Sequence, residues 1–184
     1  VVGEIALLNE FNEIDFYDDK TSVSDNNFPF KILGTSRELR KNLGNYDAFF
    51  IAIGDNKKRS EKTIWLDDFK SKSINLIHPK STLTKFITLG SGICVMAGAV
   101  INSGTVIGDG SIINTSASID HDCHIKDFVH ISPNCSLSGN IKVGNFTHIG
   151  TGSSIHPGIQ IGYEVKVAVG SKIYKNIPDN TIYK

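Results

Sequence analysis

An aliphatic residue occupies every sixth position over more than half of this chain. The series runs from Ile77 to Ile173 with no change of register. Helices repeat about every 3.6 residues and strands every two, so neither sets a strict period of six. With apolar residues at 40% of the sequence, a chance run of this length is negligible. The period is typical of a parallel β-helix, in which each hexapeptide forms one side of a coil. The series is Ile77, Leu83, Leu89, Val95, Ile101, Ile107, Ile113, Ile119, Ile125, Ile131, Leu137, Val143, Ile149, Ile155, Ile161, Val167 and Ile173.

A second column, four residues after the aliphatic one, is mostly small and predicts side chains that point inward at the corners. It includes Ser111, Ala117, Cys123, Val129, Cys135, Thr147, Ser153, Val165 and Ser171. We expect Cys123 and Cys135 to fill the core, and a chain with no CxxC pair fits a reducing cytoplasm. Glycine directly follows the aliphatic residue in several repeats, where we expect a turn to need backbone freedom: Gly90, Gly108, Gly144, Gly150 and Gly162.

The hexapeptides resemble those of the left-handed β-helix acyltransferases, triangular prisms with three hexapeptides per coil. The resemblance covers residues 77 to 173. Residues 18 apart should then stack about 4.8 Å from one another, as His130 and His148 would. The column formed by Asn114, Ser132, Gly150 and Ala168 becomes small toward its far end. It predicts a shallow track along the prism that could hold a long, thin ligand.

Residues 1–76 alternate helical and strand-like segments and predict an α/β Rossmann-like domain, followed by the β-helix over 77–184. The expected strand Asp47 to Ile53 is continuously apolar, as in a strand buried on both faces of a parallel sheet. For the last helix, Ile64, Trp65 and Phe69 form the expected apolar side. The other expected elements are a helix within 1–11, a strand over 14–17, helices over 35–43 and 57–70, and a strand over 73–77.

Doubly wound sheets bind ligands beyond the carboxyl ends of their strands. Here those ends carry Asp18-Asp19 and Gly54-Asp55-Asn56, with Arg59 one helical turn later. Free N–H groups at a helix start and the Arg59 guanidinium could bind a phosphate. The aspartates could equally be ordinary turn and cap residues. Because the chain begins at Val1, we expect the opening strand and its Gly-rich turn to have been trimmed.

His121-Asp122 lies at an outward position of its hexapeptide. A carboxylate beside an exposed imidazole can orient one ring nitrogen and raise the basicity of the other, which suits a general base. A solvated corner with no catalytic role is the alternative.

The run NTSASIDHDCHIKDFVHISPNCSLSG, from Asn114 to Gly139, and the AIGDN turn resemble the bacterial sugar O-/N-acyltransferases. This family pairs a small Rossmann-like domain with a left-handed β-helix. Its members include acetyltransferases of UDP-4-amino sugars in the bacillosamine pathway, of perosamine and viosamine nucleotides, and of sialic acid. The resemblance covers essentially the whole chain, apart from the expected opening strand and the usual tail after Asn180.

The resemblance implies an acetyl-CoA-dependent N-acetyltransferase that acts on the 4-amino group of a nucleotide-linked 4-amino-4,6-dideoxy sugar, with a UDP sugar favoured, in bacterial glycan or glycoprotein synthesis. His121 would be the general base, Asp122 would orient it, and the Gly139 N–H would be an oxyanion donor. His130, Gly150, Thr151 and Ala168 would line the CoA track. Asp18, Asp19, Gly54, Asp55, Asn56, Arg59 and Asn114 would hold the sugar nucleotide. The family forms homotrimers with active sites between subunits.

Three other functions stay open at this point. O-acetylation of sialic acid or another sugar would use the same base. A metalloenzyme resembling the γ-class carbonic anhydrases would need three converging imidazoles from His121, His124, His130 and His148. A non-catalytic sugar-nucleotide binding protein is the third. The acyl transfer requires no metal, and we expect none.

Composition narrows the partners further. Lys and Arg together number 19, as do Asp and Glu, which argues against recognition of nucleic acid by charge. No apolar run approaches the ~20 residues of a membrane span, so we expect a cytoplasmic bacterial protein. The nucleotide (UDP, dTDP or GDP) and the sugar are not identified by the sequence.

Overall fold

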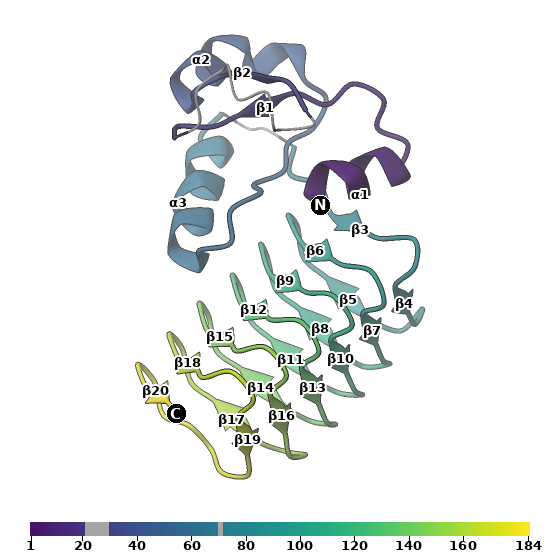
Figure 1. Cartoon of the computed structure of the whole chain (residues 1–184), viewed down its shortest axis with the longest axis vertical. Coiled ribbons are helices and arrows are strands. Elements are labelled where there is room, and N and C mark those ends of the chain that lie inside the picture. Colours follow the sequence, from purple (N-terminus) through teal and green to yellow (C-terminus); the bar gives the residue numbers. More distant parts are fainter. Residues whose placement is uncertain (21–29, 70–71) are drawn as a thin grey trace.

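The structure, a computed structural model, describes residues 1–20, 30–69 and 72–184. A small α/β region sits on one end of a long prism built of short strands (Figure 1). Its helices are α1 (Val2–Leu8), α2 (Ser36–Asn42), the 3₁₀ turn η1 (Leu43–Asn45) and α3 (Asn56–Asp67), and its strands are β1 (Phe16–Tyr17) and β2 (Ile32–Gly34). Within the described residues, every helix is too short or too polar to cross a bilayer.

The prism has three faces, each a parallel sheet. Face 1 contains β4 (Thr82–Leu83), β7 (Val100–Ile101), β10 (Ser118–Ile119), β13 (Ser136–Leu137), β16 (Ser154–Ile155) and β19 (Lys172–Ile173). Face 2 contains β5 (Thr88–Leu89), β8 (Val106–Ile107), β11 (His124–Ile125), β14 (Lys142–Val143) and β17 (Gln160–Ile161). Face 3 contains β3 (Leu76–Ile77), β6 (Cys94–Val95), β9 (Ile112–Ile113), β12 (His130–Ile131), β15 (His148–Ile149), β18 (Lys166–Val167) and β20 (Ile182–Tyr183).

The register confirms the predicted coil of 18 residues. Ser118 pairs with Ser136, and His130 pairs with His148. Each strand from β3 to β19 ends on a residue of the aliphatic series, and these side chains, from Val95 onward, are almost completely buried inside the prism. The second column also points inward, with Ala117, Cys123 and Val129 at 0% exposure. The six-residue pattern therefore gave the correct position of every coil.

The corners differ from the expectation about glycine. Every sixth residue from Gly92 to Gly170 has a positive φ, including Asp122 and Phe128, and this position lies two residues after the predicted glycine column. The predicted column has no positive φ. A methyl group at Gly108 would lie 2.6 Å from the backbone of Lys126, and one at Gly150 would lie 2.6 Å from the carbonyl oxygen of Val167. These glycines allow neighbouring coils to approach closely; they do not supply conformational freedom.

The α/β region is less regular than the predicted doubly wound sheet. Strands β1 and β2 form a parallel pair, with Phe16 opposite Ile32. The expected strand Asp47 to Ile53 makes a single bridge, between Phe49 and Ser73, and is only partly buried. A strand buried on both faces needs a paired neighbour along each edge, which this segment lacks within the described residues. The expected strand over 73–77 contributes Leu76–Ile77 to the prism.

Helix prediction was more accurate. Helix α2 begins after Thr35, which forms a capping box with Glu38. Helix α3 begins after Asp55, whose side chain accepts the Lys58 N–H. Its expected apolar side is wrong, because Ile64 is 60% exposed. The buried face instead consists of Asn56, Arg59, Ser60 and Leu66.

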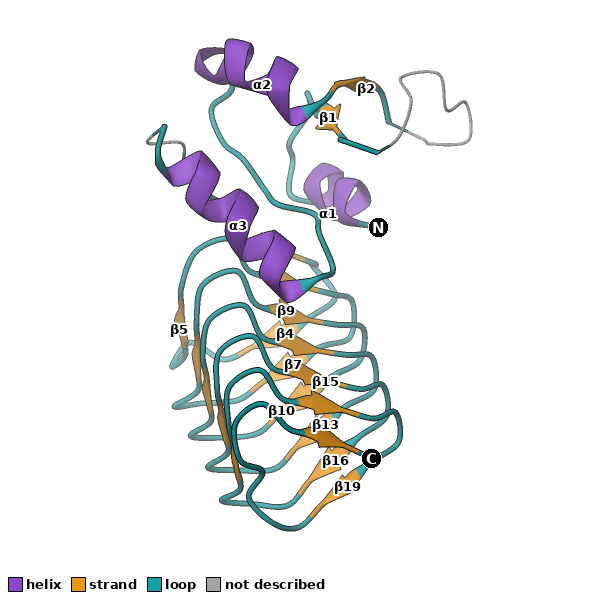
Figure 2. Ribbon diagram, turned by 90° about the vertical axis from the view of Figure 1, so that its left-hand side faces the viewer, coloured by secondary structure: helices purple, strands orange, loops and turns teal. Residues whose placement is uncertain are grey.

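Two contacts hold the α/β region on face 3. Figure 2 shows α1 and α3 lying over one end of the prism. Helix α1 places Ile5 and Ala6 against outward-facing Leu76, Cys94 and Ile112 in a second apolar cluster. The N-terminus of α3 contacts the edge between faces 2 and 3, where Lys57 pairs with Glu164 at 2.8 Å. His130 and His148 of face 3 lie beside this contact, because Asn56 of α3 donates to the carbonyls of Phe146 and Thr147.

Candidate active site

His121 lies on the edge between faces 1 and 2. Strand β10 ends at Ile119, and Asp120 and then His121 follow it. The main chain turns there with Asp122 in the left-handed region, at φ 59°. Aspartate tolerates this conformation better than most side chains. Gly104, one coil earlier, makes room for it, because a methyl group there would lie 2.3 Å from Asp122 Oδ1.

The predicted imidazole–carboxylate pair is formed. His121 Nδ1 lies 2.8 Å from Asp122 Oδ2, and the two side chains are 60% and 67% exposed. Because an ionised carboxylate only accepts hydrogen bonds, Nδ1 carries the hydrogen and Nε2 keeps a free lone pair. The hydrogen bond with Asp122, followed by the negative charge of Asp120, raises the pKa of His121 above the ordinary imidazole value. The edge therefore presents a base strengthened by its neighbours.

Gly139 lies directly beneath this imidazole, one coil further along the same edge. A methyl group at Gly139 would be 2.6 Å from His121 Nε2 and 2.7 Å from Cε1. Its carbonyl accepts the Gly158 N–H at 3.0 Å, whereas its own N–H has no acceptor among the described residues. A free backbone donor therefore lies next to the ring nitrogen that can accept a proton.

His130 lies on face 3, beside the turn at Gly54 and away from His121. Asn114 Nδ2 donates to its Nε2 at 3.1 Å, and its ring stacks on that of His148 with centroids 4.6 Å apart. Burial, followed by the charges of His148 and Arg59, lowers the pKa of His130 to about 4. Its Nδ1 is buried and forms no hydrogen bond of normal geometry within the described residues. The nearby Gly54 backbone raises the pKa of His130, but by less than burial lowers it. The ring is therefore neutral at physiological pH.

Gly150, Thr151 and Ala168 lie at or beside the edge between faces 3 and 1. Thr151 and Ala168 are exposed, whereas Gly150 is buried and its carbonyl accepts the Ser153 hydroxyl at 2.7 Å. Methyl groups at Gly152 or Gly170 would meet no atom within 4 Å. The outer surface of this edge is thus open and uncrowded, as the predicted track requires.

The Arg59 guanidinium, predicted to bind a phosphate, is hydrogen-bonded within the chain. It is 1% exposed, and its five N–H groups all have acceptors. Those acceptors are the carbonyls of Gly110, Ile53, Gly54 and Phe128 and the Asn56 side chain. Asn56 is also buried and donates to Phe146 O at 2.9 Å. These two residues attach α3 to the prism, and their hydrogen bonds leave nothing for a ligand.

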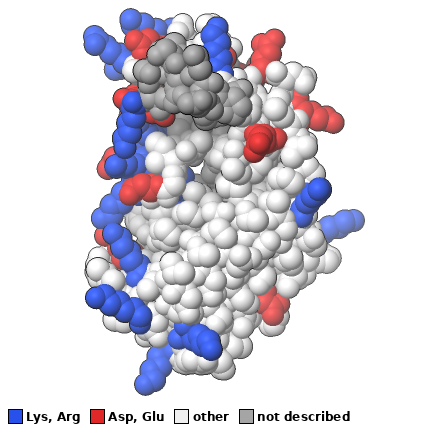
Figure 3. All heavy atoms as spheres, viewed as in Figure 1, with Lys and Arg blue, Asp and Glu red and all other residues white. Residues whose placement is uncertain are grey.

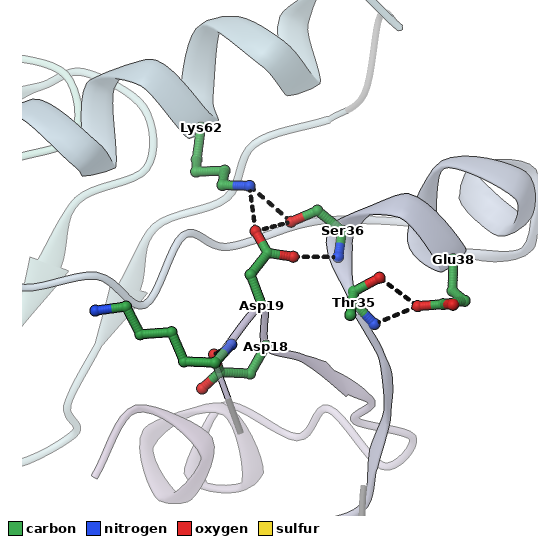
Figure 4. Close-up of polar contacts among 7 residues, drawn as sticks. Asp18, Asp19, Thr35, Ser36, Glu38 and Lys62 are labelled. Carbon is green, nitrogen blue, oxygen red and sulfur yellow. Dashed lines mark hydrogen bonds and ion pairs between the residues drawn. The ribbon is translucent and has the colours of Figure 1, made fainter. Parts of the chain in front are cut away.

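The aspartates of the predicted nucleotide site also have local partners. Asp19 accepts from the N–H and hydroxyl of Ser36 at 2.8 and 2.9 Å, and pairs with Lys62 at 2.6 Å (Figure 4). The hydrogen bond from Lys62, then that from the Ser36 backbone, lowers the pKa of Asp19 to about 2. Asp18 accepts the Lys20 N–H at 2.8 Å, and Asp55 is the α3 cap. Asp19 and Asp55 thus fit the alternative of turn and cap residues.

The four candidate metal-binding histidines do not converge. His121 is on the edge between faces 1 and 2, His124 is on face 2, and His130 and His148 are on face 3. In the part of the chain that the structure describes, no three His, Cys, Asp or Glu side chains are grouped as metal ligands. The ligand set of the γ-carbonic anhydrase hypothesis is therefore not assembled within one chain.

Two residues beside the base were missed in the sequence. Asp120 Oδ1 accepts the His121 N–H at 2.9 Å and the Asn102 side-chain amide at 3.1 Å. Asn102 and Asp120 are 18 residues apart, so indexing by coil would have placed them side by side.

The chain is similar to known acetyltransferases over nearly its whole length. Residues 1–66 match the family model described as the PglD N-terminal domain. The acetyltransferase domain of PglB from Neisseria gonorrhoeae, solved in complex with acetyl coenzyme A, is 38% identical with a TM-score of 0.92; the match covers 98% of this chain and 87% of that one. PerB from Caulobacter crescentus, solved with CoA and GDP-perosamine, is 32% identical with a TM-score of 0.88, over 97% of this chain and 85% of that one.

The left-handed prism of hexapeptides, with a histidine–carboxylate pair on one edge, defines a hexapeptide-repeat acyltransferase. A variant of a perosamine N-acetyltransferase from Caulobacter crescentus is a further match, 34% identical with a TM-score of 0.77 over 82% of this chain and 72% of that one. On the identity and coverage of these relatives, the chain belongs to the bacterial sugar acetyltransferases of the hexapeptide-repeat family.

Proposed function

We propose that this protein transfers the acetyl group of acetyl-CoA to the 4-amino group of a nucleotide-linked 4-amino-4,6-dideoxy sugar, with a UDP sugar as the favoured substrate. The observation that carries the proposal is the His121 imidazole, held at Nδ1 by Asp122, with Nε2 2.6 Å from where a methyl group on Gly139 would lie. Relatives solved with acetyl coenzyme A, or with CoA and GDP-perosamine, support this substrate class. The product would serve bacterial glycan or glycoprotein synthesis.

In this mechanism His121 Nε2 accepts a proton from the sugar amine while the amine nitrogen attacks the thioester carbonyl carbon. The Gly139 N–H donates to the oxygen on which negative charge develops. The C–S bond then breaks, the amide is formed, and the CoA thiolate leaves and takes up a proton. Asp122 keeps the Nδ1 hydrogen in place, so that the imidazolium formed during attack is stabilised by an adjacent carboxylate.

The CoA chain would lie along the edge between faces 3 and 1, over Gly150, Thr151 and Ala168, with His130 and Asn114 beside it. Neutral small side chains suit a long, narrow ligand there. In Figure 3, a broad area in the middle of the prism surface carries no charged side chains.

His121 lies on a different edge from this track, with the width of face 1 between them. One copy of the chain therefore does not bring the base and the track together. We propose a homotrimer in which the base edge of one copy meets the track edge of the next and each active site lies between two subunits.

The region over residues 1–76 would bind the sugar nucleotide, a role supported by its match to the PglD N-terminal domain. Arg59 and Asn56 attach α3 to the prism, and we retain Asp18, Gly54 and Asn114 as proposed contacts of the sugar nucleotide. In Figure 4 the Asp18 side chain points away from the cluster formed by Asp19, Ser36 and Lys62. Carboxylates in this position suit the hydroxyls of a ribose.

A thiol-release assay with acetyl-CoA tests the proposal. UDP-, dTDP- and GDP-4-amino-4,6-dideoxy sugars are offered separately, beside sialic acid, to the wild type and to His121→Ala. We expect turnover of one nucleotide amino sugar and a loss of roughly 10²- to 10⁴-fold in the variant. Acetylation of sialic acid alone would replace the N-acetyl assignment by the O-acetyl alternative. An unimpaired His121→Ala enzyme would remove His121 from the mechanism.

A further inference from the structure

The main chain around His121 is held by a carboxylate that does not touch the imidazole. Asp120 Oδ1 accepts the His121 N–H at 2.9 Å, and the same oxygen accepts the Asn102 amide at 3.1 Å from the preceding coil. The Asp120 backbone is fixed on both sides, because its N–H donates to Leu137 O at 2.9 Å and its carbonyl accepts the Thr105 hydroxyl at 2.9 Å. The residue before the base is therefore bonded to the coil on either side of it.

A carboxylate is not required merely to close such a corner. On the edge between faces 3 and 1, Asn114 Oδ1 accepts the Thr115 N–H at 2.8 Å, which is the same local bond made by a neutral side chain. The negative charge of Asp120 therefore needs a reason other than turn geometry. Hydrogen bonds from the His121 backbone and from Asn102 lower the pKa of Asp120, so the group stays ionised throughout the physiological range.

The two aspartates flanking His121 make different contacts. Asp122 bonds to the ring, at Nδ1, whereas Asp120 bonds to the backbone and to Asn102. The neighbouring coils bring only uncharged residues to this corner, namely Ser103 and Gly104 before it and Gly139 and Asn140 after it. The charges that act on the imidazole are thus those of Asp120 and Asp122.

We propose that Asp120, held by Asn102, is a positioning residue for the acetyl transfer: it fixes the backbone of His121 and its charge favours the protonated imidazole. The inference rests on the proposed role of His121 as the base. In the free enzyme the two carboxylates strengthen the base, and during amine attack they stabilise the imidazolium that forms. Asn102 sets the orientation of the Asp120 carboxylate, so it acts on the base through two successive hydrogen bonds.

The matched substitution is Asp120→Asn, which keeps an oxygen that can accept both hydrogen bonds and removes only the charge. The first measurement is independent of catalysis. The His121 imidazole of the full-length protein is titrated by NMR after histidine labelling, with its signal assigned through His121→Gln. We expect Asp120→Asn to titrate at lower pH than the wild type. Asp109→Asn is the control, since Asp109 Oδ1 likewise accepts a backbone N–H, that of Ser91 at 2.7 Å, on another edge.

The second measurement is the pH profile of kcat/KM with acetyl-CoA and the UDP-4-amino-4,6-dideoxy sugar. Asp120→Asn should move the acid limb to lower pH and lower the plateau by roughly 2- to 5-fold, because a weaker base transfers the proton less effectively. Asn102→Ala should reduce the plateau in the same direction, whereas Asp109→Asn should retain the wild-type profile.

An identical His121 titration in the wild type and Asp120→Asn would overturn the inference and leave Asp120 as a turn cap. A shifted titration accompanied by full activity of His121→Ala would instead reject the proposed base while leaving the coupling of Asp120 to His121 established. The two failures are therefore distinguishable.

Discussion

Gly139→Ala tests how closely the base must be placed, with one added methyl group. The structure puts the new carbon 2.6 Å from His121 Nε2, about 0.8 Å short of the 3.4 Å of an ordinary contact. Gly139 has no positive φ, and the corresponding positions in other coils carry the side chains of Ser103, Thr115 and Thr151. The backbone accepts alanine, so the strain falls on the exposed imidazole.

The ring can relieve the contact only by moving away from Gly139 or by losing its bond to Asp122. Misplacement of a catalytic group by about 1 Å can cost on the order of 10²-fold in rate, so we expect kcat/KM to fall by roughly that factor. Stability should change by less than about 0.5 kcal/mol, as for a surface substitution. The backbone N–H is retained, and the loss therefore reports ring position and not the oxyanion donor.

The assay is thiol release at saturating acetyl-CoA, with the melting temperature measured alongside. Gly44→Ala is the matched control, because a methyl group there meets nothing within 4 Å. A Gly139→Ala enzyme that melts like the wild type and keeps its rate would refute the argument that the ring must lie over this glycine. A variant that loses several degrees of melting temperature would show instead that the coil has been disturbed.

Three further predictions concern titration and docking. Because the pKa of His121 is raised from 6.5 and the base acts unprotonated, the acid limb of kcat/KM should lie above pH 6.5, and a limb below that value would contradict the assigned contacts. The pKa of Asp19 is lowered from 3.8 to about 2, so its carboxylate should stabilise the fold above pH 3.8 and lose that contribution as the pH falls toward 2. In Asp19→Asn, the free energy of unfolding should therefore fall less steeply over this pH range. The difference should be at most about 1 kcal/mol for so exposed a pair, and circular dichroism would measure it. Arg59→Met should destabilise the protein by about 3 kcal/mol, because it leaves buried carbonyls unpaired. Denaturant unfolding would measure the loss. Lys58→Met, at an exposed position of the same helix, is the control and should keep the wild-type midpoint.

The prism could be predicted because its pattern is local and repeated. Each aliphatic residue of the series is placed by its own hexapeptide, and errors do not accumulate when 18-residue coils stack in register. The pairing of His121 with Asp122 is likewise local, since the two residues are adjacent in sequence. The bond between Asn102 and Asp120 follows from the same coil arithmetic.

The α/β region could not be predicted as well, because its packing depends on contacts far apart in sequence. In the sequence, Arg59 looks like an exposed residue of a surface helix. In the structure it is buried, and the carbonyls of Gly110 and Phe128 in the prism accept its hydrogen bonds. The Asp47 to Ile53 segment has the composition of a central strand, but composition does not supply the neighbours that it would pair with. The glycine column was recognised, although its cause, the approach of the next coil, requires the three-dimensional stack.

The fixed 18-residue register also sets the spacing between sites along the prism in steps of one coil. Helix α1 packs against its first coils, and the corner that holds His121 lies further along the prism, each coil adding about 4.8 Å. Inserting or deleting one complete coil between them would preserve every pairing rule while moving His121 by one such step relative to α1. The distance between α1 and His121 can therefore change in this architecture only by whole coils, whereas a gain or loss of one residue would turn the aliphatic series out of the core.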